Sequence, residues 1–496
     1  MLGDFCWEDV IVIVIRDKLG GMMNNEQIEL DFLISSISQG KVISTDKVLA
    51  WMKRQNEEVV SNIKQIPLEE VRNWGYRDDR IRHESGKFFS IDGIRVSTNY
   101  RDVASWDQPI INQPEIGFLG FITKKIDGVL HFLAQAKIEP GNLNVVQLSP
   151  TLQATRSNFT QVHGGKKPNY LEYFNGERKV KILVDQLQSE QGARFLHKRN
   201  RNIIVEITED VDIEVNENFI WLSLGQLKEL MRYPNVMNMD SRTVISCIRF
   251  GNYSEHSLKM MSAFMELNTK SDNQLIYSML SHNNHLHEQE EIIQWMTGLK
   301  FRYDLEVNQI GISKMRHWVY DGNTIHHEAN KYFDVIGVRV EIGNREVVSW
   351  DQPMVRSAQE GLMGFVVKKI NGIYHFLVQA KLESGNFDII EMAPTVQCLT
   401  GNYRKGTNEY TIPYLEEVLN APKEKIWYAT YQSEEGGRFF QEQNLNTIVE
   451  VGDDFPVEVD PNYCWMTLNQ MLSFVTYNNY LNIAARSLLS AISFIK

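Results

Sequence analysis

Cysteine is scarce in the 496-residue sequence, which contains only Cys6, Cys247, Cys398 and Cys464. These residues are scattered, form no CxxC pair and do not have the spacing of a disulfide framework. The pattern argues against a secreted scaffold that is held together by disulfides. Reduced thiols in a cytoplasm are the natural interpretation, and we expect a cytoplasmic protein.

Long apolar runs are also missing. No stretch approaches the roughly 20 apolar residues that a membrane-spanning helix needs. The short apolar block Val10–Ile15 lacks a preceding basic segment and a following small-residue cleavage site, so it is a poor signal peptide. We interpret residues 1–24 as an N-terminal extension, either disordered or the product of a start ahead of Met22 or Met23.

Basic residues are fewer than acidic residues. Lys and Arg number 51 against 63 Asp and Glu, which gives a net charge of −12, and a nucleic-acid-binding surface is therefore not indicated. Several catalytic motifs are absent as well, among them GxGxxG, GxxxxGK[ST] and GxSxG. Dinucleotide oxidoreductases, P-loop enzymes and serine hydrolases consequently lack support.

What the sequence does contain is an internal repeat. SWDQP occurs at Ser105–Pro109 and again at Ser349–Pro353, an offset of 244 residues. QSEQGARF (Gln188–Phe195) matches QSEEGGRF (Gln432–Phe439) at the same offset, with no net gap. The two halves are therefore copies of one domain. We divide the chain into a first copy over 25–233, a linker or bridging segment without a counterpart over 234–268, and a second copy over 269–496.

Each copy has an α+β pattern. Apolar residues at helical spacing predict a helix through Leu30–Ile37, a second helix capped by Ser44 and a short third helix from Pro67 to Trp74. Alternating patterns then predict a mostly antiparallel, curved sheet, and Ser223 caps a closing helix through Leu230. The strands are expected at Phe88–Ser97, Gly117–Lys124, Val129–Ile138, Val145–Thr155, Val180–Gln188 and Ile203–Ile207.

Three of these strands have one strongly polar face. Their outward positions, taken by alternation, are His131, Gln135, Lys137, Gln147, Ser149, Thr151, Gln153, Gln186, Gln188 and Glu190. A solvated sheet surface is one explanation. We favour a lined pocket, because amides and hydroxyls are the groups that orient a sugar or a base, whereas solvated faces are richer in Lys, Glu and Thr.

The second copy has kept the framework and lost part of this polar set. Gln147, Ser149 and Arg156 are replaced by Glu391, Ala393 and Thr400. Arg156 is a candidate for binding phosphate, since arginine binds phosphate bidentately; the alternative is an exposed loop arginine.

Other aromatic and histidine residues are weaker candidates. Trp106 and Trp350 are candidates for stacking on a nucleobase, with core packing as the alternative. We interpret His282, His285 and His287 as a polar turn rather than a metal site.

Several denser motifs resemble one family, the NDP-hexose 2,3-dehydratases. They are EPGN (Glu139–Asn142), QLSPT (Gln147–Thr151), QATRSN (Gln153–Asn158), LVDQLQSEQG (Leu183–Gly192) and NMDSRTVISC (Asn238–Cys247). The weaker echo of these motifs in the second copy also fits that family's tandem repeat. The resemblance implies a Nudix-like fold in each half, a homodimer, and a dTDP-binding site in each half, of which one is catalytically competent. The Nudix box itself is absent, so a magnesium-dependent pyrophosphatase is not expected.

The resemblance also implies a hydro-lyase that acts on dTDP-4-keto-6-deoxyglucose, needs no cofactor and supplies an NADPH-dependent 3-ketoreductase. We assign catalysis to the first copy, with Lys137, His131, Glu139, Glu190 and Tyr170 as acid, base and donor groups whose individual roles stay open. Substrate binding is assigned to Trp106, Gln135, Asn142, Gln147, Ser149, Thr151, Gln153, Arg156, Gln188 and Arg194. A second nucleotide site is assigned to Trp350, Gln379, Lys381, Thr395, Gln397, Gln432 and Arg438. A nucleotide-sugar hydrolase and a non-catalytic nucleotide-sugar-binding protein remain the alternatives.

Lys137→Ala is expected to abolish turnover of the dTDP-sugar, whereas Lys381→Ala should leave much of it, because the first copy has the fuller polar set. Mass spectrometry of the products formed by the two purified variants checks this ranking. Equal losses, or the opposite ranking, would show that the first copy is not the catalytic one.

Overall fold

The computed structural model describes residues 24–40, 42–100, 103–155, 167–251, 253, 273–281, 283–342, 349–399 and 411–494. The extension predicted for the N-terminus lies outside these residues except for Asn24, and the candidates Arg156 and His282 also lie outside them. No helix in the described ranges is long and apolar enough to cross a membrane.

The elements of the first copy confirm the α+β class. In chain order they are α2 (Asn24–Ile37), α3 (Thr45–Glu58), β1 (Ser61–Ile66), η1 (Leu68–Glu70), β2 (Trp74–Arg77), β3 (Arg80–His83), β4 (Ser90–Thr98), β5 (Ser105–Asn112), β6 (Phe118–Ile126), β7 (Val129–Ile138), β8 (Val146–Ser149), β9 (Leu152–Ala154), η2 (Leu171–Tyr173), β10 (Lys181–Ser189), β11 (Arg199–Ile207), β12 (Phe219–Ser223), α5 (Leu224–Leu230) and α6 (Met239–Ser246).

The second copy repeats nearly the same order. Its elements are α8 (Asn273–Leu280), α9 (Gln289–Arg302), β13 (Leu305–Ile310), η3 (Ile312–Lys314), β14 (Trp318–Tyr320), β15 (Thr324–His327), β16 (Phe333–Ile342), β17 (Ser349–Ser357), β18 (Gly361–Ile370), β19 (Ile373–Lys381), β20 (Glu391–Ala393), β21 (Val396–Leu399), α11 (Leu415–Leu419), η4 (Lys423–Lys425), β22 (Ile426–Ser433), β23 (Gln443–Glu450), β24 (Tyr463–Thr467), α12 (Leu468–Phe474) and α13 (Ile483–Ser490).

Each copy forms one large mixed sheet. The strand order is β10-β11-β6-β7-β12 in the first copy, with β8 on β7 and β9 on β6. It is β22-β23-β18-β19-β24 in the second copy, with β20 on β19 and β21 on β18. Only β11 with β6, and β23 with β18, pair in parallel within these sheets.

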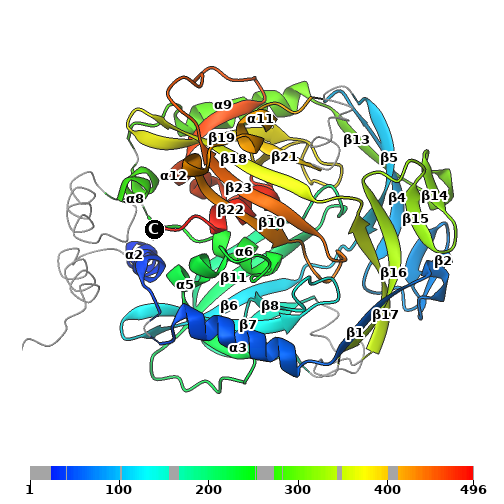
Figure 1. Cartoon of the computed structure of the whole chain (residues 1–496), viewed down its shortest axis with the longest axis horizontal. Helices are drawn as coiled ribbons and strands as arrows, with labels where there is room; N and C mark the ends of the chain where they lie inside the picture. The colour runs from blue at the N-terminus through cyan, green and yellow to red at the C-terminus, as the bar shows by residue number, and fades with distance from the viewer. Residues whose placement is uncertain are drawn as a thin grey trace, which may run out of the picture.

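The copies exchange a strand with each other. β1 of the first copy pairs antiparallel with β16 of the second, from Ser61↔Ile342 to Ile66↔Gly337. β13 of the second copy pairs in the same way with β4 of the first. Figure 1 shows the two exchanged sheets together at one side of the molecule, beside the two large sheets. Each small sheet therefore needs chain from both copies.

The aspartate of each SWDQP motif stabilises this strand exchange by binding arginines from both copies. Asp107 accepts hydrogen bonds from Arg95 of its own copy at 2.8 Å and from Arg316 of the other copy at 2.8 Å. Asp351 is held by Arg339 and by Arg72 in the equivalent arrangement. Burial would raise the pKa of Asp351, but the arginine hydrogen bonds outweigh it and lower the pKa to about 2. The same balance holds the pKa of Asp107 well below its usual range.

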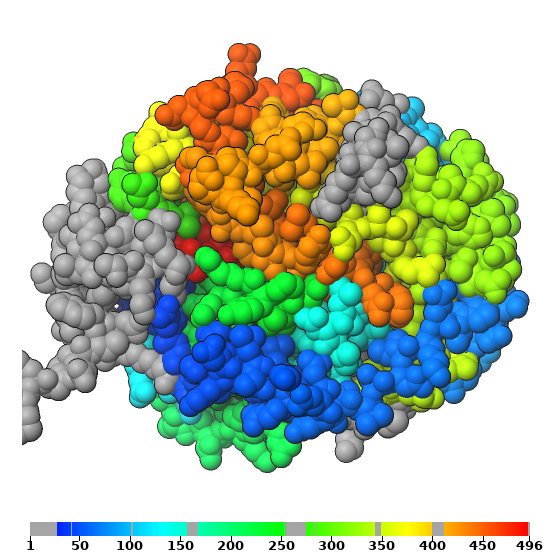
Figure 2. All heavy atoms as spheres, in the orientation of Figure 1, coloured from blue at the N-terminus to red at the C-terminus, as the bar shows by residue number. Residues whose placement is uncertain are grey.

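Two turns per copy interlock at the boundary between the copies. The Gly141 N–H donates to the Gly436 carbonyl at 2.7 Å, and the Gly385 N–H donates to the Gly192 carbonyl at 2.7 Å. A Cβ atom at Gly141 would lie 1.6 Å from the backbone oxygen of Phe439. Only glycine allows this approach of the two backbones. Figure 2 shows the first copy (cyan) directly against the second (orange) on this face of the molecule.

A large hydrophobic core crosses the boundary between the copies. It contains Phe132 and Phe376 from the two large sheets together with residues of α6 and α13. α6 and α13 pack against each other, and each carries a fully buried arginine that reaches the other copy. Arg242 donates to the carbonyl of Ser433, and Arg486 donates to the carbonyl of Ser189.

Most predicted elements are present with small changes. Ser223 caps α5 through a hydrogen bond from the Gln226 N–H, whereas Ser44 precedes α3 without making a side-chain cap. The third predicted helix is only the 3₁₀ turn η1, because Trp74 already begins β2. The strand predicted over Val145–Thr155 is split into β8 and β9.

The segment predicted as a linker begins with a helix that has a counterpart. α6 of the first copy and α13 of the second lie 244 residues apart. Their caps, Asn238 and Asn482, make equivalent hydrogen bonds to Ser241 and Ala485. Met237 and Leu481 also make equivalent bridges to the large sheets. Residues 237–247 are thus part of the repeated unit rather than of a connection.

Asp107→Asn is expected to lower the free energy of unfolding at pH 7 by about 1.5–3 kcal/mol, because charged hydrogen bonds across the exchanged sheets are lost. The folded-state pKa of Asp107 is depressed, so its contribution is present above the unfolded pKa of about 4 and disappears as the pH falls below it. Urea unfolding at pH 7 and at low pH measures the difference from the wild type. A difference that does not shrink at low pH would contradict this origin.

Candidate functional site

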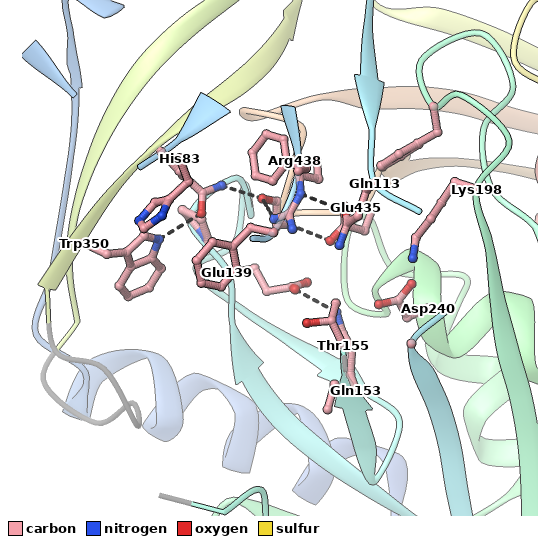
Figure 3. Close-up of a pocket in the computed structure, with 18 of the residues that line it drawn as sticks. His83, Gln113, Glu139, Gln153, Thr155, Lys198, Asp240, Trp350, Glu435 and Arg438 are labelled. Atoms are coloured by element: carbon pink, nitrogen blue, oxygen red, sulfur yellow. Dashed lines mark hydrogen bonds between the residues drawn. The ribbon is translucent and has the colours of Figure 1, made fainter. Parts of the chain in front are cut away.

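A cavity of about 650 Å³ lies where the two copies meet. Its volume falls within the usual range for small-molecule sites. Figure 3 shows Trp350 and His83 at one end of the cavity and Lys198 and Asp240 at the other, with Arg438 and Glu435 between them. The walls come from both copies, so the cavity depends on the interlocked turns.

The EPGN turn and β9 of the first copy supply one wall. Gln153 donates to Glu139 Oε1 at 2.8 Å and accepts from Asn238, the cap of α6, at 3.0 Å. Lys137, at the end of β7, donates to the backbone oxygen of Gln153 at 3.2 Å. The Oε2 atom of Glu139 is buried and has no hydrogen-bond partner among the described residues.

The end of β10 and the start of β11 supply a second wall. Glu190 accepts from the Asn200 amide at 2.7 Å, and Asn200 in turn accepts from the Gly117 N–H at 3.1 Å. Burial raises the pKa of Glu190, although Lys198 and Arg486 oppose the rise. Burial lowers the pKa of Lys198 to about 8, against the opposing effect of Glu190. A lysine with this pKa can give up or take a proton near neutral pH.

Helix α6 places Asp240 in the cavity. Its side chain is buried, with 3% of the residue exposed, and its Oδ1 atom has no hydrogen-bond partner in the described ranges. Burial raises the pKa of Asp240 well above its ordinary value, and the neighbouring charges of Glu435, Glu190 and Glu139 raise it further. A position in the first turn of a helix favours the ionised form of a carboxyl, but burial outweighs that effect here.

The second copy completes the cavity with Glu435 and Arg438. Both follow β22 in the turn that interlocks with the EPGN turn of the first copy. Burial raises the pKa of Glu435 to about 7; Arg438 opposes this, and Glu139 and Glu190 add to it. The Arg438 guanidinium lies 4.3 Å from the centre of the Phe89 ring and donates to Gln113 at 3.3 Å.

Aromatic side chains line the opposite end. Trp350 on β17 donates to Gln352 at 2.9 Å, and Gln352 donates to the Gly437 carbonyl at 2.6 Å. These bonds couple the tryptophan of the SWDQP motif to the turn that carries Glu435 and Arg438. His83 lies at the same end. Its ring contacts Trp74 and Phe88, Trp74 in turn contacts Phe89, and all four residues line the cavity.

Taken together, the cavity joins an aromatic end to four buried groups whose pKa values are moved toward neutrality, namely Glu190, Lys198, Asp240 and Glu435. Such perturbed groups are typical of acid–base catalysis. Among the described residues, no group of three His, Cys, Asp or Glu side chains is arranged to hold a metal ion.

The structure brings six of the predicted site residues together in this cavity. They are Lys137, Glu139, Gln153, Glu190, Trp350 and Arg438. Trp350 and Arg438 were predicted for the other nucleotide site. They line this one because the copies interlock, which no residue pattern within one copy reveals.

Two predicted catalytic residues do not line the cavity. The His131 ring is buried, its Nδ1 atom lies 2.9 Å from the Val129 carbonyl, and burial lowers its pKa. The Tyr170 hydroxyl donates to the Glu214 carbonyl at 2.8 Å, and its ring packs edge-on against Phe219. Both side chains are therefore engaged by the protein itself, away from the cavity.

The remaining predicted binding residues are bonded elsewhere. The predicted polar face of the sheet is largely covered by protein: Gln147 accepts from Ser433 at 2.9 Å, and Gln188 donates to the Val475 carbonyl at 2.6 Å. Arg194 lies 4.1 Å from the centre of the Phe333 ring, in the arrangement equivalent to Arg438 on Phe89. Outside the cavity also lie Trp106, Gln135, Asn142, Ser149, Thr151, Gln379, Lys381, Thr395, Gln397 and Gln432.

Sequence reasoning missed Lys198, Asp240 and Glu435. A signal was present, since the residues at the equivalent positions of the other copy are Glu442, Ala484 and Gln191. Each of the three positions changes its charge between the copies. Asp240 was not compared with Ala484, because the segment that contains α6 was predicted to be a linker without a counterpart.

Comparisons with known proteins agree on one family. The family model described as NDP-hexose 2,3-dehydratase matches residues 45–248 and again residues 289–492. A dTDP-4-dehydro-6-deoxy-alpha-D-glucopyranose 2,3-dehydratase of Saccharopolyspora spinosa is 41% identical over 471 residues, which are 95% of each chain. Proteins with the same name are 38% identical in Amycolatopsis orientalis, over 93% of each chain, and 40% identical in Streptomyces violaceoruber, over 91% of this chain and 98% of that one.

Asp240→Asn is expected to raise the free energy of unfolding at pH 8 by about 1–3 kcal/mol, because the amide cannot ionise and so avoids the desolvation cost of a buried carboxyl, which is at least that of a neutral polar group. The folded-state pKa is raised, so the wild type loses stability as the pH rises above the unfolded value of about 4, and the amide does not. Denaturant unfolding of both proteins at pH 4 and pH 8 measures this gain. A variant that is less stable than the wild type at pH 8 would refute the assignment of Asp240 as a strained site residue.

Proposed function

The chain belongs to the NDP-hexose 2,3-dehydratase family, and from this we propose that it removes water across C2 and C3 of dTDP-4-keto-6-deoxyglucose. The three relatives carry the corresponding name and align over nearly their whole length. The protein is a hydro-lyase. The observation that carries the substrate to this chain is the cavity, which combines an aromatic end with buried acid and base groups.

The chemistry requires one base, one acid and a donor. The C4 ketone acidifies the C3 proton, so a base removes that proton to form an enolate, and an acid assists the C2 hydroxyl as it leaves. Each positioned acid or base typically contributes about 10²–10⁴-fold to the rate. The enol product then takes up a proton at C2 to give a 3,4-diketo-2,6-dideoxy sugar, and no net oxidation or reduction takes place.

The cavity offers groups for each of these roles. Lys137 and Lys198 supply positive charge or N–H donors for the enolate oxygen at C4. Glu139 and Glu190 are the candidate bases, because an amide side chain holds one oxygen of each carboxylate. The aromatic end at Trp350 suits the thymine ring.

Catalysis belongs to this cavity rather than to its equivalent in the other half. There Glu442, Ala484 and Gln191 replace Lys198, Asp240 and Glu435. The other half keeps Lys381 and Glu383, with Gln397 donating to Glu383 at 2.9 Å. A nucleotide-sugar site without turnover is consistent with that set, as expected from the family's tandem repeat.

The finer features implied by the family are part of this proposal. Each large sheet with its helices is taken as a Nudix-like core, supported by the mixed strand order β10-β11-β6-β7-β12. The protein acts as a homodimer, and an NADPH-dependent 3-ketoreductase consumes the diketo product, since a reactive dicarbonyl requires reduction.

Incubation of the pure protein with dTDP-4-keto-6-deoxyglucose, with and without such a reductase, tests the proposal by mass spectrometry. We expect loss of one water from the sugar, trapped as a 2,6-dideoxy product only when the reductase is present. Unchanged substrate that still protects the protein from thermal unfolding would indicate a binding protein instead. Release of phosphate with a divalent-metal requirement would indicate a nucleotide-sugar hydrolase.

A further inference from the structure

Two buried carboxyls in the cavity come from different copies of the repeat. Asp240 is on α6 of the first copy, and Glu435 is in the turn after β22 of the second. Apart from burial, the negative charge of Glu435 is the neighbouring charge that raises the pKa of Asp240 most. Neither carboxyl has an acidic equivalent in the other half, where the residues are Ala484 and Gln191.

Hydrogen bonding separates these two carboxyls from the other two. Glu139 and Glu190 each receive an N–H from an amide side chain, at 2.8 and 2.7 Å. Donors of this kind stabilise the ionised form, which is the form that a base needs. Asp240 Oδ1 has no donor among the described residues, and Glu435 receives the Gly437 backbone N–H at 3.1 Å.

The other half of the molecule keeps this distinction. Its equivalents of the amide-held carboxyls are Glu383 and Glu434, and both again receive an amide N–H, from Gln397 and Asn444. Only the pair without side-chain amide donors has no acidic counterpart there. The two kinds of carboxyl therefore differ in whether the other half also carries them, which is expected if they serve different steps.

We propose that Asp240 and Glu435, which line the cavity from different copies, act together as the acid: one proton is carried on either of the two carboxyls and is delivered to the C2 hydroxyl as it leaves. The inference rests on the proposed function and adds the identity of its acid. The C3–H bond breaks first and its proton goes to a base, Glu139 or Glu190. The C2–O bond then breaks, the hydroxyl takes the shared proton and departs as water, and the electron pair of the C3 carbanion forms the C2=C3 bond.

The surroundings favour a pair that holds a single proton. Glu139 and Glu190 face Asp240 and Glu435 with negative charge, and Lys137 and Arg438 face them with positive charge. Burial raises the pKa of both members. Two carboxyls that are buried in one cavity do not both ionise easily, which favours one proton on the pair.

Separating the two bond-breaking steps tests the proposal. Wild type, Asp240→Asn and Glu435→Gln are incubated with dTDP-4-keto-6-deoxyglucose in D₂O, with the reductase present to trap product. Water loss is measured from the trapped product, and deuterium at C3 is measured in the remaining substrate. We expect each variant to lose water about 10²–10⁴-fold more slowly, while exchange at C3 stays within a few-fold of the wild type.

The double variant and two controls complete the experiment. Because the pair acts as one unit, Asp240→Asn combined with Glu435→Gln should be little worse than either single change. Glu190→Gln should reduce exchange and water loss together if Glu190 is the base. Glu57→Gln, which changes an exposed carboxyl of α3 that does not line the cavity, should leave both rates within about twofold of the wild type.

The outcomes are distinct. Exchange that falls in parallel with water loss in both variants would overturn the pair as the acid, as would unimpaired water loss. Absence of water loss in the wild type would overturn the proposed function itself. Denaturant unfolding of each variant at the assay pH confirms that a lost rate is not a lost fold.

Discussion

Close contact between two pairs of glycine-containing turns is the constraint on which the site depends. The N–H of Gly141 reaches the carbonyl of Gly436, and Gly385 and Gly192 make the same contact in the other half. Because no Cβ fits between these backbones, the two turns pack with their main chains touching. Glu139 and Glu435, carried by these turns, are thereby brought into one cavity.

The fold tolerates one buried aspartate without a full set of hydrogen-bond partners, because other buried aspartates form ion pairs that stabilise the structure. Asp107 and Asp351 are also buried, but arginines from both copies satisfy them, and they hold the exchanged strands. Asp240 has no such partner for its Oδ1 atom within the described chain. Strain of this kind persists only where surrounding structure over-determines it, and here the shared core and the exchanged sheets provide that structure.

Sequence reasoning recovered what is local and missed what crosses between copies. Helical spacing and caps located α2, α3 and α5, and alternation located β7 with its bounds unchanged. Alternation placed Lys137 on a polar face, and Lys137 lines the cavity. It also placed Gln147 and Gln188 on such a face, where residues of the other half cover them. Strand exchange and the contribution of Glu435 depend on how two similar units dock, and periodicity within one unit holds no information about docking. The repeat continues beyond residue 233 into α6 and α13, so the difference between Asp240 and its equivalent Ala484 was visible in the sequence.

The interlocked arrangement has a consequence for how such a protein can change over generations. In a symmetric dimer of identical chains, every substitution appears in both sites at once. Joining the copies into one chain lifts that restriction, so that a lysine at 198 can coexist with a glutamate at 442. Yet the cavity still draws on both copies, and a mutation in the turn at Glu435 is felt by a cavity built mainly from the opposite half. Neither copy can therefore be discarded, although only one half carries carboxyls at the positions of Asp240 and Glu435.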